Sequence, residues 1–167
     1  MLHWLSMIIM GIDPGIARIG WGVLEISKST VTPLAFGCIE TDKGKSPETR
    51  LGEIYDALEV LFAKHRPDVC AVEDLFFATN AKTAIGVGQS RGVVLLAASK
   101  SRISVVSYSP LAVKRAITGD GKADKKQVER MVVLTLRLRQ APKLDDTADA
   151  LAVAMTHAYS YKIKQLV

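Results

Sequence analysis

The hydrophobic pattern of this chain changes near residue 46, and that change constrains the fold more than any other feature. Before it, three β-rich segments at 7–12, 19–26 and 31–39 are separated by turn residues. After it, stretches with helical spacing alternate with short apolar runs. Three hairpin-linked strands followed by alternating helices and strands predict an α/β fold around a single mixed five-stranded sheet.

The ends of the expected helices are marked by capping residues. Ser46 before Pro47 predicts a helix start with Ser46 as the N-cap. Asp124 followed by Gln127 has the pattern of a capping box. We expect helices at 46–66, 83–100, 110–119, from 124 onward and at 145–161, and further strands at 69–72 and 103–108. This order of elements matches the ribonuclease H-like arrangement, in which helices flank the sheet.

The length of 167 residues, nearly half of them hydrophobic, suits one domain spanning residues 1–167. Residues 1–6 are interpreted as a short extension before a catalytic fold at about 7–161. They lack the features of a secretory signal, and no apolar run is long enough to cross a bilayer. Cys38 and Cys70 are too few for a disulfide framework, and both are expected to be small buried hydrophobes. These features predict a cytoplasmic protein with no membrane partner.

The two halves of the chain carry opposite net charges. Residues 1–80 hold 7 Lys and Arg against 11 Asp and Glu, a net charge of −4, whereas residues 81–167 hold 15 against 6, a net charge of +9. A basic half suits contact with a nucleic acid, because Lys and Arg displace counterions from phosphates. A solvated charged surface would give the same counts, so charge alone leaves both interpretations open.

Four acidic residues stand where packing alone does not readily explain a carboxylate. Asp13 and Glu73 end apolar strands, and Asp146 and Asp149 share one face of an apolar helix. Carboxylates buried together repel one another, and a divalent cation would remove that cost. Oxygen ligands without a Cys/His cluster favour Mg²⁺ or Mn²⁺ over zinc. Two such ions about 4 Å apart would stabilise the attacking and leaving oxygens of a phosphodiester displacement.

Each acid taken alone also has a structural explanation. Asp13 before Pro-Gly could form an Asx turn, and Glu73 could end its strand in solvent. Asp146 and Asp149 could be first-turn acids that favour the helix dipole, although Asp149 falls among apolar positions. Asp145 could share the face of Asp149 as well as Asp146 does, and spacing leaves that choice open. The four acids together are more specific than any member, and they indicate a metal-dependent nuclease.

Four motifs that contain these acids occur in order along residues 7–157. They are Gly11-Ile12-Asp13-Pro14-Gly15 with Gly20-Trp21-Gly22-Val23, Val72-Glu73-Asp74-Leu75-Phe76-Phe77 with Asn80, Gly88-Gln89-Ser90-Arg91-Gly92-Val93, and Asp146-Thr147-Ala148-Asp149-Ala150-Leu151-Ala152 with Thr156-His157. This set resembles the RuvC family of Holliday-junction resolvases. Four such motifs at compatible spacing are highly specific, whereas an isolated Asp-Pro-Gly would be weak.

The resemblance implies a homodimeric endodeoxyribonuclease that binds a four-way junction and symmetrically nicks two strands of like polarity. It also implies ligatable products with a 5′-phosphate and a 3′-hydroxyl, a modest preference for a thymine-containing sequence, and cooperation with the RuvA–RuvB branch-migration complex in recombination and DNA repair. The family's catalytic and metal-binding positions correspond to Asp13, Glu73, Asp146 and Asp149, with two Mg²⁺ or Mn²⁺ ions per site. On this pattern Asp145 is interpreted as an N-cap.

The sequence departs from the family pattern at two acids. Asp74 stands where family members often carry glutamine, and Asp145 adds a carboxylate before the last motif. Both leave open which carboxylate orients the attacking water. Some members have histidine at the position of Asp146, so this acid is less diagnostic than the other three. Arg91 could contact phosphate or bridge the fold, and His157 is expected to be structural.

Aromatic and basic residues near the acids are candidates for DNA contact. One of Phe76 and Phe77 is expected in the core, and the resemblance gives Phe76 the role of stacking on an unpaired base. Lys114 and Lys125 match family lysines that contact the substrate near the cleaved phosphate. Lys122 lies in a glycine-containing basic loop that resembles a phosphate-contacting turn. Any of these lysines could instead belong to an ordinary solvated surface.

Three other functions are compatible with parts of the pattern. A ribonuclease H-like nuclease acting on RNA precursors or hybrids would use the same acids. An ATP-binding lobe of the actin and sugar-kinase type also opens with a strand, an Asp and glycines, but needs a second lobe for which 167 residues leave no room. A non-catalytic junction-binding module is disfavoured because all four acids are present.

Overall fold

A five-stranded sheet forms the centre of the computed structural model, which describes residues 6–28, 30–74 and 81–166, with only the backbone at 81–83 and 162–166. The strands are β1 (Met7–Asp13), β2 (Arg18–Ser27), β3 (Thr30–Glu40), β4 (Val69–Glu73) and β5 (Ser104–Tyr108). The helices are α1 (Pro47–His65), α2 (Ala81–Lys100), α3 (Pro110–Thr118), α4 (Lys125–Thr135) and α5 (Asp145–Leu166). The expected elements are all present in the expected order.

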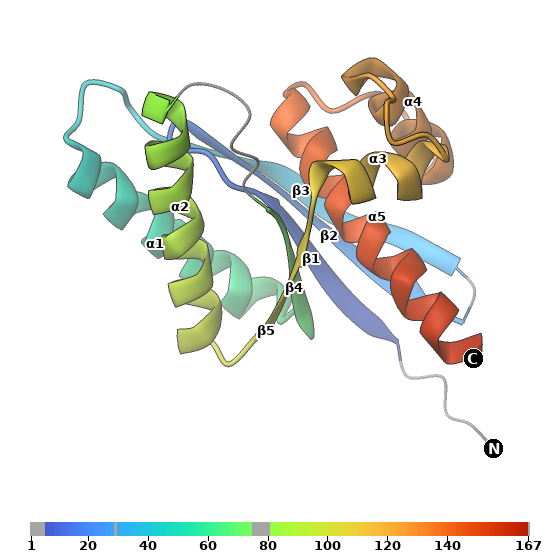
Figure 1. Cartoon of the computed structure of the whole chain (residues 1–167). Coiled ribbons are helices and arrows are strands. Elements are labelled where there is room, and N and C mark those ends of the chain that lie inside the picture. The colour runs from blue at the N-terminus through green and yellow to red at the C-terminus, as the bar shows by residue number, and fades with distance from the viewer. Residues whose placement is uncertain (1–5, 29, 75–80, 167) are drawn as a thin grey trace.

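The sheet has the order β3-β2-β1-β4-β5 and is mixed (Figure 1). β1, β2 and β3 pair antiparallel, because short turns join them. β1, β4 and β5 pair parallel, because α1 and α2 provide the connections that parallel neighbours require. The prediction of an α/β, ribonuclease H-like fold with a single mixed five-stranded sheet is therefore confirmed.

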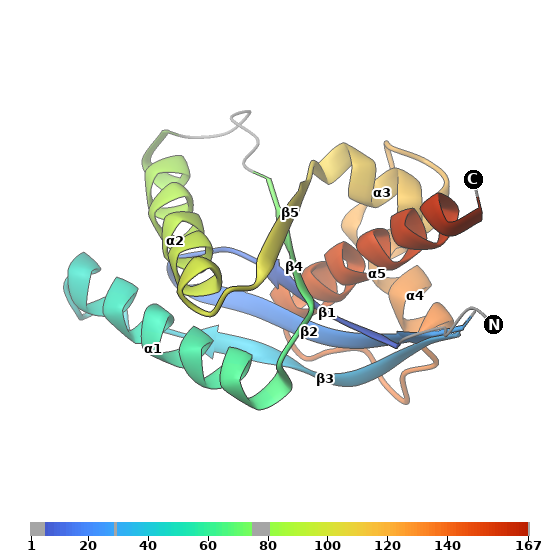
Figure 2. The same ribbon diagram turned by 90° about the horizontal axis from the view of Figure 1, so that it is seen from below.

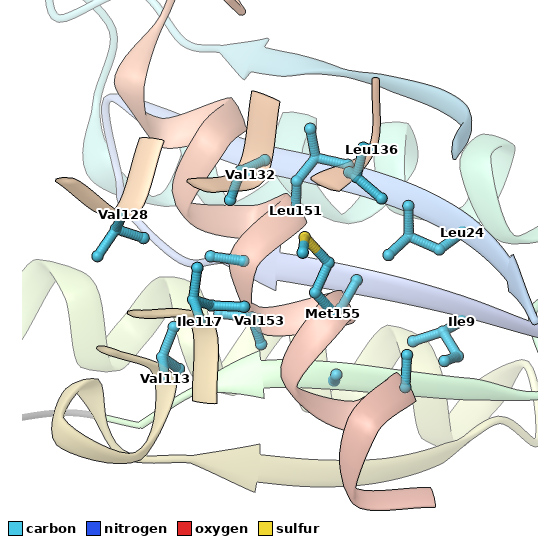
Figure 3. Packing of buried hydrophobic residues seen from close by; sticks show 14 of the residues in the cluster. Ile9, Leu24, Val113, Ile117, Val128, Val132, Leu136, Leu151, Val153 and Met155 are labelled. Carbon is cyan, nitrogen blue, oxygen red and sulfur yellow. The ribbon is translucent and has the colours of Figure 1, made fainter. Parts of the chain in front are cut away.

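Helices cover both faces of the sheet (Figures 1 and 2). α1 and α2 lie on one face, over a core that contains Met10, Ile12, Leu58 and Val94. α3, α4 and α5 lie on the other face. Figure 3 shows the core beneath these three helices; its labelled residues are Ile9, Leu24, Val113, Ile117, Val128, Val132, Leu136, Leu151, Val153 and Met155. α5 contributes side chains to the middle of this second core. Its packing on the sheet therefore fixes the position of the acidic first turn of α5.

Helix ends follow the expected capping pattern in part. The Asp124 side chain accepts from the backbone N–H of Gln127, and the Gln127 side chain accepts from the backbone N–H of Asp124, so the capping box is confirmed. Ser46 occupies the N-cap position of α1 but makes no capping bond, because its hydroxyl pairs with the Thr49 hydroxyl at 2.9 Å. The interpretation of Asp145 as an N-cap is wrong, since it is the first residue of α5.

Two further expectations concern the thiols and the membrane. Cys38 and Cys70 are both free, and Cys70 is buried as expected. Cys38 is only partly buried, because it lies on β3 at the edge of the sheet. None of the helices in the described part of the chain is both long and apolar enough to cross a membrane.

Candidate active site

Strand alternation places Asp13 and Glu73 on the same face of the sheet. On β1, Ile9 packs in the core beneath α5, so Asp13, four residues on, faces the same side. On β4, Ala71 packs in that core, so Glu73, two residues on, also faces it. β1 and β4 are parallel neighbours, and both acids lie at the carboxyl ends of their strands. Two carboxylates distant in the sequence are thereby brought to one edge of the sheet.

Helix α5 completes the acidic group because it lies directly on the backbone of β1 and β2. A Cβ at Gly11 would come within 2.8 Å of the Ala154 Cβ. A Cβ at Gly20 would collide with the carbonyl oxygen of Asp146. Gly20 is also the strand partner of Asp13. The absence of a side chain at Gly20 therefore lets the backbone of Asp146 approach the strand pair that carries Asp13.

The carboxylates raise one another's pKa. Burial, followed by the charges of Glu73, Asp149 and Asp146, raises the pKa of Asp13 to about 8. Burial and the charge of Asp149 raise the pKa of Glu73 to about 7. Burial also raises the pKa of Asp149, whose side chain is 23% exposed. The four acids thus share one electrostatic neighbourhood, in which they cannot all ionise cheaply at neutral pH.

Lys125 is the cation closest to this acidic group in the described structure. Its ammonium lies 2.9 Å from Asp149 Oδ2 and 3.6 Å from Asp145 Oδ2. Although burial acts to lower it, the hydrogen bond and charge of Asp149 raise the pKa of Lys125 to about 12. The charge of Lys114 acts on Glu73 and lowers its pKa. Both lysines therefore lie beside the carboxylates, as expected for residues near a bound phosphate.

The structure separates the roles open to Asp145 and Asp146. Asp146 raises the pKa of Asp13, and its side chain is 26% exposed. Its Oδ2 atom is buried without a hydrogen-bond partner, with Arg18 Nε at 3.5 Å. Asp145 is 59% exposed and faces Lys125 instead. The geometry thus favours Asp146 over Asp145 as the member of the acidic group.

The donor set fits divalent cations of the hard, oxygen-preferring kind. Burial, followed by the charges of neighbouring carboxylates, raises the pKa of Asp13 and Glu73, and Asp146 Oδ2 is buried without a donor. A divalent cation would relieve both conditions. In the described parts of the chain, no three acidic, His or Cys side chains are already gathered closely enough to hold a metal ion. We expect a cation to draw the carboxylates together.

The raised pKa values predict that the metal-free protein loses stability as the pH rises. The folded chain holds the Asp13 proton up to about pH 8, whereas the ordinary pKa in an unfolded chain is 3.8. Between these values the folded state binds more protons, so rising pH favours unfolding. Asn at position 13 cannot ionise, so the folded variant does not bear the cost of a buried carboxylate charge as the pH rises. We therefore expect the free energy of unfolding of Asp13→Asn, in chelator at pH 8, to exceed that of the parent by an amount on the order of a few kcal/mol.

Thermal unfolding in chelator from pH 5 to pH 9 measures this effect. The melting temperature of the parent should fall more steeply across this range than that of Asp13→Asn. Asp56→Asn removes an exposed acid on α1 and serves as the control, which should follow the parent. Equal slopes for the parent and Asp13→Asn would show that Asp13 is not held protonated by its neighbours.

The remaining predicted residues fall outside this group. Phe76 and Phe77 lie outside the described residues. Lys122 is exposed in the loop before α4, where its backbone N–H donates to Asp120 Oδ1 at 2.8 Å. The loop position leaves the Lys122 ammonium accessible to solvent, while the tie to Asp120 fixes its backbone.

Arg91, whose role was open, and His157, which was expected to be structural, both have structural contacts. Arg91 pairs with Asp74 at 3.0 Å and donates to Ser107 Oγ at 2.8 Å, so it bridges the ends of β4 and β5. Asp74 carries a negative charge where family members often have a neutral glutamine, and its ion pair with Arg91 compensates that charge. His157 Nδ1 lies 2.8 Å from the Tyr108 hydroxyl, which agrees with a structural role.

Arg18 is the neighbour of the acids that sequence reasoning missed. It begins β2 and contacts Asp146 across 128 positions of sequence. The available signal was a basic residue three positions after the Asp-Pro-Gly turn in the acidic half of the chain. Spacing could not reveal its partner, because the contact depends on how α5 crosses β2.

Comparison with known proteins gives a consistent set of matches. The family model described as crossover junction endodeoxyribonuclease RuvC matches residues 9–157. A crossover junction endodeoxyribonuclease RuvC from Brevibacillus brevis is 48% identical over 152 residues, which are 91% of this chain and 92% of that protein. Its counterpart from Caldanaerobacter subterraneus is 46% identical over 154 residues, 92% of this chain and 93% of that protein.

A solved structure agrees with these relatives. Thermus thermophilus RuvC in complex with Holliday junction substrate is similar with a TM-score of 0.89 and 35% sequence identity. The similarity covers 95% of this chain and 96% of that one. The relationship therefore extends over nearly the whole chain in both sequence and structure.

Proposed function

This chain belongs to the RuvC family of crossover junction endodeoxyribonucleases, and we propose that it resolves Holliday junctions by cutting two DNA strands of like polarity. The observation that carries the proposal is that Asp13, Glu73, Asp146 and Asp149 lie at one edge of the sheet, where burial raises the pKa of Asp13, Glu73 and Asp149. An acidic group of this kind with lysines beside it suits hydrolysis of a phosphodiester.

We propose that these four carboxylates hold two Mg²⁺ or Mn²⁺ ions. When bound, the ions would supply Lewis-acid stabilisation of the charge that develops on the attacking and leaving oxygens. Asp13 would be a central ligand of this set, since the charges of three other carboxylates act on its pKa. Glu73, Asp146 and Asp149 would complete the ligand set.

Lys114 and Lys125 would hold the strand that is cut. The Lys125 ammonium is paired with Asp149 and is largely exposed, so a phosphate can take the place of its carboxylate partner. Lys114 lies close enough for its charge to act on Glu73. In the reaction, a water oxygen bonds to phosphorus as the bond from phosphorus to the 3′ oxygen breaks. The 3′ oxygen takes a proton, so the products carry a 5′-phosphate and a 3′-hydroxyl.

The decisive experiment is a cutting assay on a synthetic mobile four-way junction. We expect paired nicks with Mg²⁺ or Mn²⁺, weak cutting of linear duplex, and no cutting with excess chelator, because the repelling carboxylates need a cation. Matched RNA hairpins and hybrids test the alternative of an RNA-processing nuclease. Tight junction binding without nicking in either metal would instead support a non-catalytic module.

Helix α2 presents an apolar stripe that supports the proposed homodimer. Ile85 is 65% exposed and Leu96 is 51% exposed, eleven positions apart on one face of the helix. Gly92 between them has open space where a Cβ would stand. Burying such a stripe against the same stripe of a second copy would satisfy two-fold symmetry. Two copies would then present two acidic groups to two strands.

A charge in the stripe should dissociate the dimer. Leu96→Glu would place two carboxylates in a desolvated contact, so we expect mainly monomer at micromolar concentration. Sedimentation equilibrium measures the mass, and Leu134→Glu on α4, at a residue 71% exposed, is the matched control. Unchanged mass for Leu96→Glu, or equal dissociation by Leu134→Glu, would place the interface elsewhere.

Three further expectations also stay predictions. Cooperation with the RuvA–RuvB complex would couple cutting to branch migration. Contact of Phe76, Phe77 and Lys122 with the junction is testable by substitution and binding assays. A cytoplasmic location would suit a DNA-recombination and repair enzyme.

A further inference from the structure

The turn that follows Asp13 has three consecutive backbone carbonyls that accept hydrogen bonds from distant parts of the chain. The first is the carbonyl of Gly15, which accepts from the Ser90 hydroxyl at 2.9 Å, across 75 positions of sequence. Ser90 lies on α2 and is fully buried. The third carbonyl, that of Ala17, accepts from the backbone N–H of Thr41 at 3.0 Å. The turn is therefore fastened to α2 on one side and to the end of β3 on the other.

The middle carbonyl, that of Ile16, has two donors. It accepts from Thr41 Oγ1 at 2.5 Å and from Arg50 Nη2 at 3.1 Å. Arg50 Nε also donates to Thr41 Oγ1 at 2.9 Å, so one guanidinium from the start of α1 holds both the carbonyl and its other donor. We call the side chains of Ser90, Thr41 and Arg50 the turn brace. Because its donors come from separate elements, the turn brace fixes the turn in more than one direction.

The turn brace is joined to Asp13 by a short and stiff stretch of backbone. Asp13 is the last residue of β1, and only Pro14 separates it from Gly15. Pro14 is buried, and its ring fixes the backbone angle φ. A displacement of the Gly15 peptide is therefore passed on to Asp13, because Pro14 has little freedom to absorb it.

The position of Asp13 needs support because its charged form is disfavoured. Burial and the charges of three neighbouring carboxylates all act against an ionised Asp13, and ionised Asp13 is the form that binds a cation. An outward shift of the turn would relieve the repulsion between the carboxylates. The turn brace opposes this shift, since the shift would leave the carbonyls of Gly15 and Ile16 without their donors.

We propose that Ser90, Thr41 and Arg50 are positioning residues that hold Asp13 where it binds a divalent cation. The inference rests on the proposed function, because it concerns the same acidic group and its cations. Ser90 has no exposed surface and acts only through the carbonyl of Gly15. When the turn brace is weakened, cation binding must also supply the free energy that returns Asp13 to its place. Cation affinity then falls, whereas the site saturated with cation stays intact.

Two substitutions weaken the turn brace from opposite sides. Ser90→Ala removes the hydroxyl that α2 supplies, and Arg50→Met removes the donors that α1 supplies while keeping an unbranched side chain. Neither residue belongs to the acidic group. Circular dichroism and thermal unfolding in chelator show whether each variant is folded, and either variant alone suffices for the test if the other is not.

Each substitution has a matched control. Ser160→Ala also removes a hydroxyl that donates to a backbone carbonyl at 2.9 Å, but its acceptor is Thr156 of the same helix, α5. Arg102→Met removes an exposed guanidinium just before β5, next to the end of that strand that lies away from Tyr108, the partner of Glu73. Both controls leave the turn brace unchanged.

The first readout is Mn²⁺ binding without DNA, followed by the electron paramagnetic resonance signal of the free ion. Ser90→Ala and Arg50→Met should bind Mn²⁺ about tenfold more weakly than the parent, as is usual when a partner that orients a metal ligand is lost. Both controls should bind Mn²⁺ as the parent does. Unchanged Mn²⁺ affinity in the folded brace variants would overturn the proposal, even if their melting temperatures fell, because a merely structural role lowers stability alone.

The second readout is single-turnover cutting of a four-way junction over a range of Mn²⁺ concentrations. The concentration for half-maximal cutting should rise by about tenfold in both brace variants. Their rates at saturating Mn²⁺, and their affinity for the junction in chelator, should stay within about threefold of the parent. A rate that saturating Mn²⁺ does not restore would also overturn the proposal. Failure of the parent to cut any junction would instead overturn the proposed function.

Discussion

Replacing Asp13 by Asn should lower junction cutting by about a thousandfold or more, while junction binding in chelator stays within about threefold of the parent. Asn keeps the size of the side chain but removes the charge to which three other carboxylates are coupled. Without that charge the acidic group loses its central cation ligand. Binding should persist because the basic residues of the second half are untouched, and because Asp13 in chelator is already protonated and uncharged below about pH 8.

The effect is measured by single-turnover cutting and by gel-shift or anisotropy titration on the same junction. Asp145→Asn is the matched control, because Asp145 is 59% exposed, pairs with Lys125 and does not act on the pKa of Asp13. It should cut within about tenfold of the parent. Equal loss of binding and cutting in Asp13→Asn would mean that Asp13 supports the fold or the DNA surface rather than the reaction. Parent-like cutting by Asp13→Asn would remove it from the site.

Gly20→Ala should be the most damaging small substitution in the core, with a loss of about 3 kcal/mol in the free energy of unfolding. The added methyl would collide with the Asp146 carbonyl and come within 2.9 Å of the Thr147 backbone nitrogen. Backbone atoms cannot rotate out of the way as a side chain can. The start of α5 must therefore move off the sheet, and Asp146 moves with it, away from Asp13.

Chemical denaturation and cutting assays measure the two consequences separately. Gly52→Ala on α1 is the control, since nothing lies within 4 Å of a Cβ there and alanine favours a helix by about 0.5–1 kcal/mol. We therefore expect the control to gain slight stability and keep full cutting. Folded Gly20→Ala at low temperature should still cut more slowly than the parent. If Gly20→Ala matched the stability of Gly52→Ala, α5 would not lie as closely on β2 as the structure shows.

These two predictions separate residues that lower stability for the sake of the reaction from residues that support both stability and the reaction. Asp13→Asn should stabilise the metal-free chain at pH 8 while abolishing cutting, because the acidic group is maintained against repulsion. Gly20→Ala should harm both properties, because the same close approach supports the core and carries Asp146. A variant that lost cutting without any change in stability would fit neither cause.

Local sequence signals determined much of the fold. Strand alternation, helical spacing and turn residues are properties of neighbouring positions, so the order and type of the elements could be predicted. The capping box at Asp124 and Gln127 formed because all its partners lie within four residues. The same reasoning was less accurate at helix ends, where Ser46 formed a side-chain pair instead of a cap and α5 began at Asp145 itself.

The acids of the site could be proposed from the sequence because a carboxylate at the end of an apolar strand or on a buried helix face is costly without a partner. Their catalytic roles remain predictions. The choice between Asp145 and Asp146 could not be made from spacing, because both lie within a turn of Asp149. The direction of each side chain favours Asp146, and that direction depends on how α5 is rotated against the sheet.

The tertiary structure alone decided which residues meet. The pairing of Arg18 with Asp146 joins elements that are far apart in sequence, and that of Lys125 with Asp149 depends on how the consecutive helices α4 and α5 pack. The need for glycine at position 20 also comes from a residue distant in sequence, because a side chain there would collide with the backbone of Asp146 where α5 crosses β2. Contacts of this kind depend on the packing of all the helices on one sheet, a sum of many weak non-local interactions. By itself, therefore, the sequence determined the elements and the chemistry of the acids, whereas packing decided their partners.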